Sequence, residues 1–116
     1  MVLRFYAWWL VSTQQYHSKL VYTFVMIFEF DNKKQISNLH KHGIDLQDAA
    51  CIFLDVHRLD AIDNRKDYAE ERRLVIGVVQ DRVWVVAYTQ RADAIRLISA
   101  RKANEREQNR YHALHP

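Results

Sequence analysis

The stretch LVIGVVQDRVWVVAYTQRADAIRLISA, residues 74–100, decides the fold of this chain. It holds three runs rich in valine, isoleucine and aromatic residues, which are the residue types that favour β-strands. The runs cover residues 74–79, 83–89 and 94–100, and only short polar segments separate them. We therefore expect an antiparallel meander of three strands, with a shorter strand at 59–62 added at one edge.

Two helices are expected ahead of this meander. Asp31 is placed to cap the first helix, whose apolar positions Ile36 and Leu39 lie three residues apart. Gly43 ends this helix, and Asp45 begins a second one. The buried face of the second helix is expected to consist of Leu46, Ala49, Ala50, Phe53 and Leu54. Because the link between the two helices is so short, the sequence predicts an N-terminal helical hairpin.

An early strand and a last helix complete the expected order. The apolar run that opens at Met26 predicts a strand over residues 26–30. Asn104, with Glu107 three residues later, resembles a capping box and begins a helix that reaches about residue 114. The fold class is therefore α+β, in the order strand, two helices, strands and a C-terminal helix.

The first 25 residues, MVLRFYAWWLVSTQQYHSKLVYTFV, are aromatic and apolar. A polar run at 12–19 interrupts them far short of the ~20 apolar residues that span a bilayer, and a signal-peptide cleavage site is not clear. Two interpretations remain: an added strand or partner-facing segment, or a translation start placed too early, with Met26 as the initiator. Orderly caps and turns after Met26 favour the second. We expect an extension at residues 1–25 and one functional domain at residues 26–116.

Composition places the chain among ordinary globular proteins. Of its 116 residues, 49% are hydrophobic and 27% are charged, which suits one domain with a modest core. The single cysteine, Cys51, excludes an internal disulfide and suits the reducing cytoplasm. The formal charge of +3 falls to about +1 without the first 25 residues, so a nucleic-acid site must depend on where the charges lie.

Three strings stand at fixed places after Met26: FEFDNKKQISNLHKHGI at 28–44, DYAEERRLVIG at 67–77 and VVAYTQRADAIRLISARKANEREQNRY at 85–111. Together they resemble the BrnT family of type II toxins over nearly all of residues 26–116. The resemblance implies a fold similar to RelE, with a compact antiparallel sheet and helices packed on it. It also implies an RNA-cleaving activity that halts translation. Asp81 stands where the family frequently has glycine, an exchange that would alter only the local turn.

The resemblance also implies a protein partner. BrnT-like toxins are neutralised by a BrnA-type antitoxin that carries a ribbon-helix-helix DNA-binding part. A complex of two toxins with an antitoxin dimer would repress its own operon, so the toxin would contact DNA only through the antitoxin. We expect a cytoplasmic protein with no membrane partner.

RNA cleavage without a metal requires a group that takes the proton from the 2′-hydroxyl, cations near the phosphoryl oxygens, and a proton donor for the leaving oxygen. The sequence shows no carboxylate-rich metal cluster, and we expect neither a metal nor a cofactor. His42 is the candidate acid or base, and Glu70 is an alternative base or orients His42. Three arginines suited to bidentate phosphate contact and two further RNA-binding cations complete the set: Arg72, Arg91 and Arg101, with Lys41 and Arg96.

The mechanism requires these groups to share one concave surface that can hold a bent phosphodiester. Strand alternation contributes to this expectation. It places Arg96, Ile98 and Ala100 on one face of the last strand, and Ile95, Leu97 and Ser99 on the other. Arg101 follows this strand and can reach either way.

Each of these signals has a plainer explanation. Lys41 and His42 ahead of Gly43 also suit a helix C-terminus, because cations there meet the negative end of the dipole. Glu70 can form a surface ion pair with the arginine two residues later, and Arg101 can brace the fold. The corresponding alternative function is a catalytically inactive RelE-like module that binds protein and acts as a corepressor.

Overall fold

The computed structural model describes residues 2–13, 20–65 and 69–114, with side chains for all of these except 7–13 and 20–25. The elements follow one another as β1 (Val2–Thr13), β2 (Leu20–Asp31), α1 (Asn32–His42), α2 (Leu46–Ala49), the 3-10 helix η2 (Ala50–Leu54), β3 (Leu59–Ile62), β4 (Arg73–Val79), β5 (Arg82–Arg91), β6 (Ala94–Lys102) and α3 (Glu105–Leu114). None of the helices in these residues is long and apolar enough to cross a membrane. The chain is an α+β protein.

The six strands form one sheet in the order β1-β2-β6-β5-β4-β3. The predicted meander of β4, β5 and β6 and the predicted edge strand β3 are confirmed. The sheet is mixed, however, and the expected wholly antiparallel sheet is wrong. Ile27–Phe30 of β2 pairs in parallel with Ala94–Leu97 of β6, because the chain between these strands crosses over through the helices and the meander.

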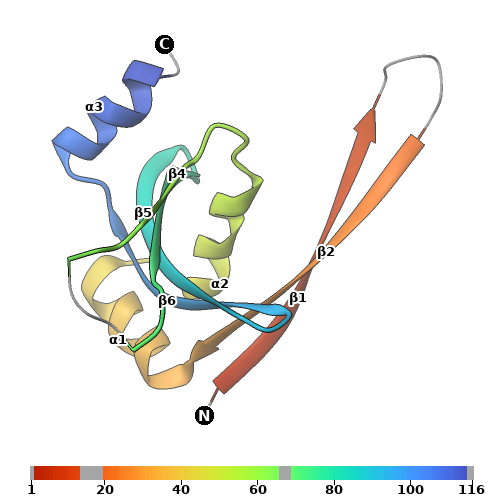
Figure 1. Cartoon of the computed structure of the whole chain (residues 1–116), viewed down its shortest axis with the longest axis horizontal. Helices are drawn as coiled ribbons and strands as arrows, with labels where there is room; N and C mark the ends of the chain where they lie inside the picture. Colours follow the sequence, from red (N-terminus) through yellow and green to blue (C-terminus); the bar gives the residue numbers. More distant parts are fainter. Residues whose placement is uncertain (1, 14–19, 66–68, 115–116) are drawn as a thin grey trace.

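The N-terminal strands form a long hairpin. β1 and β2 have twelve residues each and pair along their whole length, and Figure 1 shows them projecting from the rest of the molecule. The start of β1 packs on the domain: the Phe5 ring stacks on Phe28 at 5.3 Å between centroids, and Arg4 reaches Glu29. The strand expected at 26–30 is therefore the end of a longer strand.

The expected N-terminal helical hairpin is not present. The N-terminus consists of strands, and of the two predicted helices only α1 is a regular α-helix of several turns. Asp45 does cap α2, accepting from the Gln47 backbone N–H at 2.7 Å, but α2 has four residues and continues as η2. The predicted buried face is largely confirmed, because Leu46, Ala49 and Ala50 are buried and Phe53 packs partly against the core. The prediction is wrong for Leu54, which is 47% exposed, and in the tighter 3-10 helix Ile52 is the buried residue instead.

Gly77 of β4 explains how closely η2 approaches the sheet. A Cβ at this position would lie 2.8 Å from Cγ1 of Ile52, which is closer than real Cβ contacts. Glycine at 77 therefore lets the 3-10 helix lie directly on the strand.

α1 begins and ends where the sequence predicts. Asp31 accepts from the Lys33 backbone N–H at 2.8 Å, and Gly43 ends the helix with a left-handed φ of 73°. The two apolar positions that indicated this helix do not pack into the core, because Ile36 and Leu39 are 62% and 47% exposed. The helix packs through a polar residue that its pattern did not indicate.

That residue is Asn38, which is 5% exposed. Its Oδ1 accepts from the Ala100 backbone N–H at 2.9 Å, and its Nδ2 donates to the Ile44 carbonyl at 3.3 Å. β2 stops pairing with β6 at Leu97, and α1 takes the next part of that edge. Asn38 thus gives the Ala100 amide the partner that a neighbouring strand would have supplied.

A β-bulge interrupts the alternation along β6. Ala87 of β5 pairs with Ser99, while the next residue, Tyr88, pairs with Leu97. Ile98 is the extra residue, and such an insertion shifts every following side chain to the opposite face. The predicted alternation therefore fails after Leu97.

The bulge brings two predicted site residues onto one face. Arg96 pairs with Thr89 and Arg101 pairs with Val85, and these β5 residues are four apart in a strand that has no inserted residue. Without the bulge, Arg101 would face the side on which Ala100 now packs in the main core.

α3 is attached to the sheet at the end away from α1 (Figure 1). Its predicted capping box is confirmed, because Glu107 N–H donates to Asn104 Oδ1 at 2.8 Å and Asn104 N–H donates to Glu107 Oε1 at 2.9 Å. The Tyr111 hydroxyl donates to Asp55 Oδ2 at 2.6 Å. Burial raises the pKa of Asp55, but this hydrogen bond and two backbone N–H donors outweigh burial and hold it below its usual value.

Candidate functional site

The C-terminal end of α1 and the end of β6 enclose a hollow of about 420 Å³. Its lining consists of Lys41, His42, Gly43, Arg101 and Lys102. Among these lining residues no side chain is acidic, and three of them, Lys41, Arg101 and Lys102, are basic. The hollow therefore presents a basic surface to solvent.

A second hollow of about 260 Å³ adjoins the first along α1. It shares Lys41 and His42 with the first hollow, and its lining is Lys34, Ser37, Asn38, Lys41, His42, Ile98 and Ser99. The α1 residues in this lining recur at three- and four-residue intervals, so they lie on one face of the helix. We call the two hollows together the basic groove.

Two features of the chain shape the groove. The Gly43 backbone N–H donates to the Leu39 carbonyl at 2.9 Å, so the helix stops directly after His42. The Asn38 side chain then fixes α1 against the part of β6 that follows the bulge. The groove is therefore bounded by a helix end and a strand that are held together by a buried side chain.

Arg101 has an acidic partner on α3. Its Nη1 and Nη2 donate to the two carboxylate oxygens of Glu107 at 2.7 and 2.9 Å. The hydrogen bond from Arg101 is the main cause that lowers the pKa of Glu107 below its ordinary value. An anion in the groove would meet an Arg101 whose charge is already partly balanced.

Arg91 and Glu70 form an ion pair elsewhere. Arg91 Nη2 lies 3.1 Å from Glu70 Oε1, and this hydrogen bond raises the pKa of Arg91. Arg91 ends β5, whereas Arg101 pairs with Val85 of the same strand. Six residues of strand separate these positions by about 20 Å, so the two arginines cannot clamp one phosphate.

Arg96 belongs to a third group of charges. Its Nε donates to Glu29 Oε1 at 3.0 Å, and Arg4 Nη2 donates to Glu29 Oε2 at 3.2 Å. Glu29 is 7% exposed. Burial raises its pKa, but the two arginines outweigh burial and lower the pKa below the ordinary value. Arg96 thus joins β6 to the N-terminal hairpin.

A comparison with protein families adds to this geometry. The family model described as "Ribonuclease toxin, BrnT, of type II toxin-antitoxin system" matches residues 30–107. The chain belongs to the BrnT family. It is accordingly a ribonuclease toxin of a type II toxin-antitoxin system, with a cognate antitoxin as its partner. The comparison with curated proteins gives no match.

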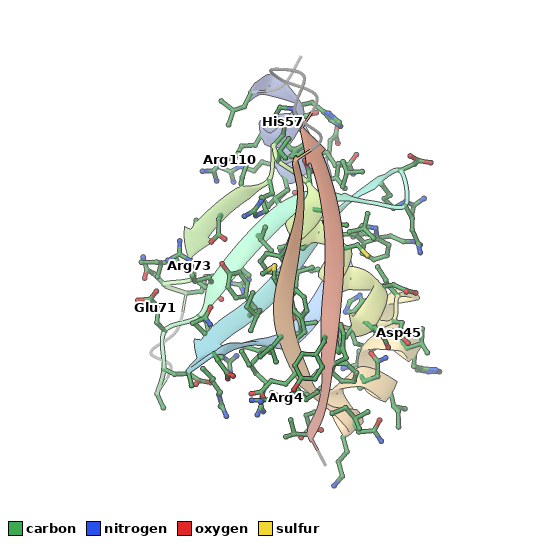
Figure 2. The ribbon with its side chains drawn as sticks, turned by 90° about the vertical axis from the view of Figure 1, so that its right-hand side faces the viewer. Arg4, Asp45, His57, Glu71, Arg73 and Arg110 are labelled. Carbon is green, nitrogen blue, oxygen red and sulfur yellow. The ribbon has the colours of Figure 1, made fainter. Side chains whose placement is uncertain are left out.

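Within the BrnT-matched span, Arg72 lies just ahead of β4. Its side chain is half-buried, and its carbonyl accepts from the Asp63 backbone N–H at 2.8 Å. The residues on either side of it, Glu71 and Arg73, form an ion pair at 3.3 Å. Figure 2 shows both on the opposite side of the molecule from Asp45, which follows α1.

The structure thus gathers three of the seven candidate residues, Lys41, His42 and Arg101, in the basic groove of this BrnT toxin. It also adds Lys34 and Lys102, which sequence reasoning missed. Lys34 could have been found from its seven-residue distance to Lys41, two turns along one helix face. Lys102 carried no such signal, because its place beside α1 depends on the tertiary packing of β6.

No group of three or more histidine, cysteine, aspartate or glutamate side chains that could hold a metal ion is found among the residues for which the structure gives positions.

Proposed function

We propose that this BrnT toxin cleaves RNA in the basic groove, with His42 as the base, Lys41 as the proton donor, and Arg101 and Lys102 as the cations around the phosphate. The observation that carries the proposal is the convergence of these four side chains on one hollow whose lining residues include no acid. Cations placed where negative charge develops in the transition state often contribute most of an enzyme's rate acceleration.

The reaction follows from these groups. The 2′-oxygen of the RNA attacks the adjacent phosphorus while His42 accepts its proton, and the bond from phosphorus to the 5′-oxygen breaks. Lys41 lines the same hollow and donates the proton that the leaving 5′-oxygen takes up. The products are a 2′,3′-cyclic phosphate and a 5′-hydroxyl. Arg101 and Lys102 supply the positive charge, so this route uses no metal.

The remaining candidates take supporting places in the proposal. Arg91, with Glu70 bound to it, is too far along β5 from Arg101 to act at the same phosphate. We therefore assign Arg72, Arg91 and Arg96 to RNA contacts away from the cleaved bond. Glu70 is then the partner of Arg91, and His42 has the base role alone.

We further infer a RelE-like toxin domain at residues 26–116 that inhibits translation in the cytoplasm, with residues 1–25 as an extension. The antiparallel meander with α1 beside its last strand supports the RelE-like arrangement. The family match at 30–107 lies wholly inside this domain.

The partner in this proposal is a BrnA-like ribbon-helix-helix antitoxin, bound as a dimer by two toxins, and DNA is contacted only through it. Two exposed apolar side chains of α1, Ile36 and Leu39, support a protein interface on that helix. An antitoxin seated there would cover the side of α1 that faces away from the groove-lining residues Lys34, Asn38 and Lys41, so its contact with this helix would be separate from the RNA site.

The test compares His42→Ala with Lys33→Ala, an exposed α1 residue outside the groove lining. Expression of the wild type and of Lys33→Ala should arrest growth, and the antitoxin should restore it. The purified proteins should cut RNA in the presence of a metal chelator, and the antitoxin should block this cleavage. His42→Ala should lower the cleavage rate at least 100-fold, the lower range for loss of an acid-base group. A purified wild-type chain that binds the antitoxin and leaves RNA intact would instead identify the inactive corepressor module.

A further inference from the structure

The second hollow of the basic groove is not used by the cleavage step. It extends from Lys41 and His42 toward the N-terminal half of α1, and it adds one cation, Lys34, and two hydroxyl side chains, Ser37 and Ser99. None of the residues that line it carries a carboxylate. A surface with this chemistry suits an anion with several oxygen acceptors.

The two hollows together are longer than one phosphate group. Lys34 and Lys41 are seven residues apart on the same face of α1, which corresponds to about 10 Å along the helix axis. On the opposite wall, the lining runs from Ile98 at the bulge to Lys102 at the end of β6. The walls are therefore roughly parallel, and a chain of linked phosphates can follow them.

We propose that the second hollow is a subsite for a neighbouring phosphodiester of the same RNA strand, with Lys34 as its cation and Ser37 and Ser99 as hydrogen-bond donors. This inference rests on the proposed function, because it places the cleaved bond in the first hollow. Lys41 lines both hollows and contacts both phosphates. Half-buried Ile98 offers an apolar surface to the ribose or base between them.

The sequence provides a matched control for this subsite. Lys33 and Lys34 are adjacent and exposed, and the backbone N–H of each donates to Asp31 Oδ1. Only Lys34 lines the groove. Replacing either side chain by alanine removes one positive charge and leaves the helix cap in place, so a difference between the two variants reports the subsite.

The experiment measures binding of thymidine oligodeoxynucleotides, which lack the 2′-hydroxyl and therefore remain intact. A dimer has one phosphodiester and a tetramer has three. Each phosphate contact in a single strand adds about 0.7 to the slope of log affinity against log salt. One contact therefore makes the affinity about fivefold higher at 0.1 M salt than at 1 M. The wild type should bind the tetramer at least about fivefold more tightly than the dimer at 0.1 M salt.

Lys34→Ala should remove this advantage and lower the salt slope for the tetramer by about 0.7, whereas Lys33→Ala should change neither. Lys34→Glu should weaken tetramer binding further. The subsite is refuted if the two alanine variants show the same length dependence while the wild type still binds oligonucleotides and cleaves RNA. A wild type that binds no oligonucleotide and cuts no RNA removes both this subsite and the proposed function.

Discussion

Replacing Asn38 by alanine should destabilise the fold more than any other loss of a single polar side chain in α1. Asn38 is 5% exposed, and it satisfies two backbone groups of buried residues, the Ala100 N–H and the Ile44 carbonyl. Leaving a buried polar group without a partner reduces stability by about 1–3 kcal/mol. The Ile44 contact is the longer of the two, so we expect a total loss of about 2–4 kcal/mol. This is a large fraction of the ~5–15 kcal/mol that stabilises an ordinary domain.

The assay is urea unfolding of the wild type, Asn38→Ala and Asn109→Ala. Asn109 is an exposed residue of α3, so the control makes the same chemical change and includes the same gain of about 0.6 kcal/mol in helix propensity. Hydrogen exchange gives a second measurement, because the Ala100 amide should lose protection selectively in Asn38→Ala.

Two results would refute this reasoning. One is an Asn38→Ala stability within about 0.5 kcal/mol of the Asn109→Ala control, the spread of an ordinary surface substitution. The other is unchanged protection of the Ala100 amide, which would mean that another group replaces Asn38 at the edge of β6.

Three further predictions concern stability. Gly77→Ala should lower the free energy of unfolding by about 1–3 kcal/mol through the clash with η2, and a loss below about 0.5 kcal/mol in urea titrations would contradict the packing argument. Gly43→Ala, which meets nothing within 4 Å, should lose about 1–2 kcal/mol through its left-handed φ alone. Folding lowers the pKa of Glu29, so the stability that its charge contributes is present above its ordinary pKa of 4.5 and is lost as the pH falls through its folded pKa. The stability of Glu29→Gln should therefore decline less steeply in acid than that of the wild type. Burial and the hydrogen bond to Asp55 raise the pKa of Tyr111 to about 12. The stability that this hydroxyl contributes is therefore present below its ordinary pKa of 10 and is lost between pH 10 and about 12. A Tyr111→Phe variant whose stability declines in alkali as the wild type's does would contradict this.

The helix ends and most strands follow from the sequence because their signals are local. Asp31 and Gly43 bound α1 as predicted, and the reciprocal bonds of Asn104 and Glu107 begin α3. Each of these signals relates backbone and side-chain groups only a few residues apart. The residues that carry the family resemblance could likewise be found by inspection, including Lys41 and His42.

The second predicted helix failed for a tertiary reason. Its apolar residues fit an α-helix, but Ile52 packs against Gly77 of β4, which lies 25 residues later in the chain. The segment therefore continues as the 3-10 helix η2 against that strand. The exposed Leu54 shows the same limit, because apolar periodicity alone does not predict whether packing against a neighbouring strand favours an α-helix or a 3-10 helix.

The sequence by itself determined the α+β class, the meander, the caps of α1 and α3, and the presence of Lys41, His42 and Arg101 as candidate groups. Only the tertiary structure decided which cations meet. The bulge at Ile98 turns Arg101 to the face of Arg96, and Asn38 holds α1 against β6 so that the basic groove can form. The physical reason is that capping and alternation depend on neighbours in sequence, whereas strand register and the seating of a helix depend on contacts between segments about 60 residues apart, such as that between Asn38 and Ala100.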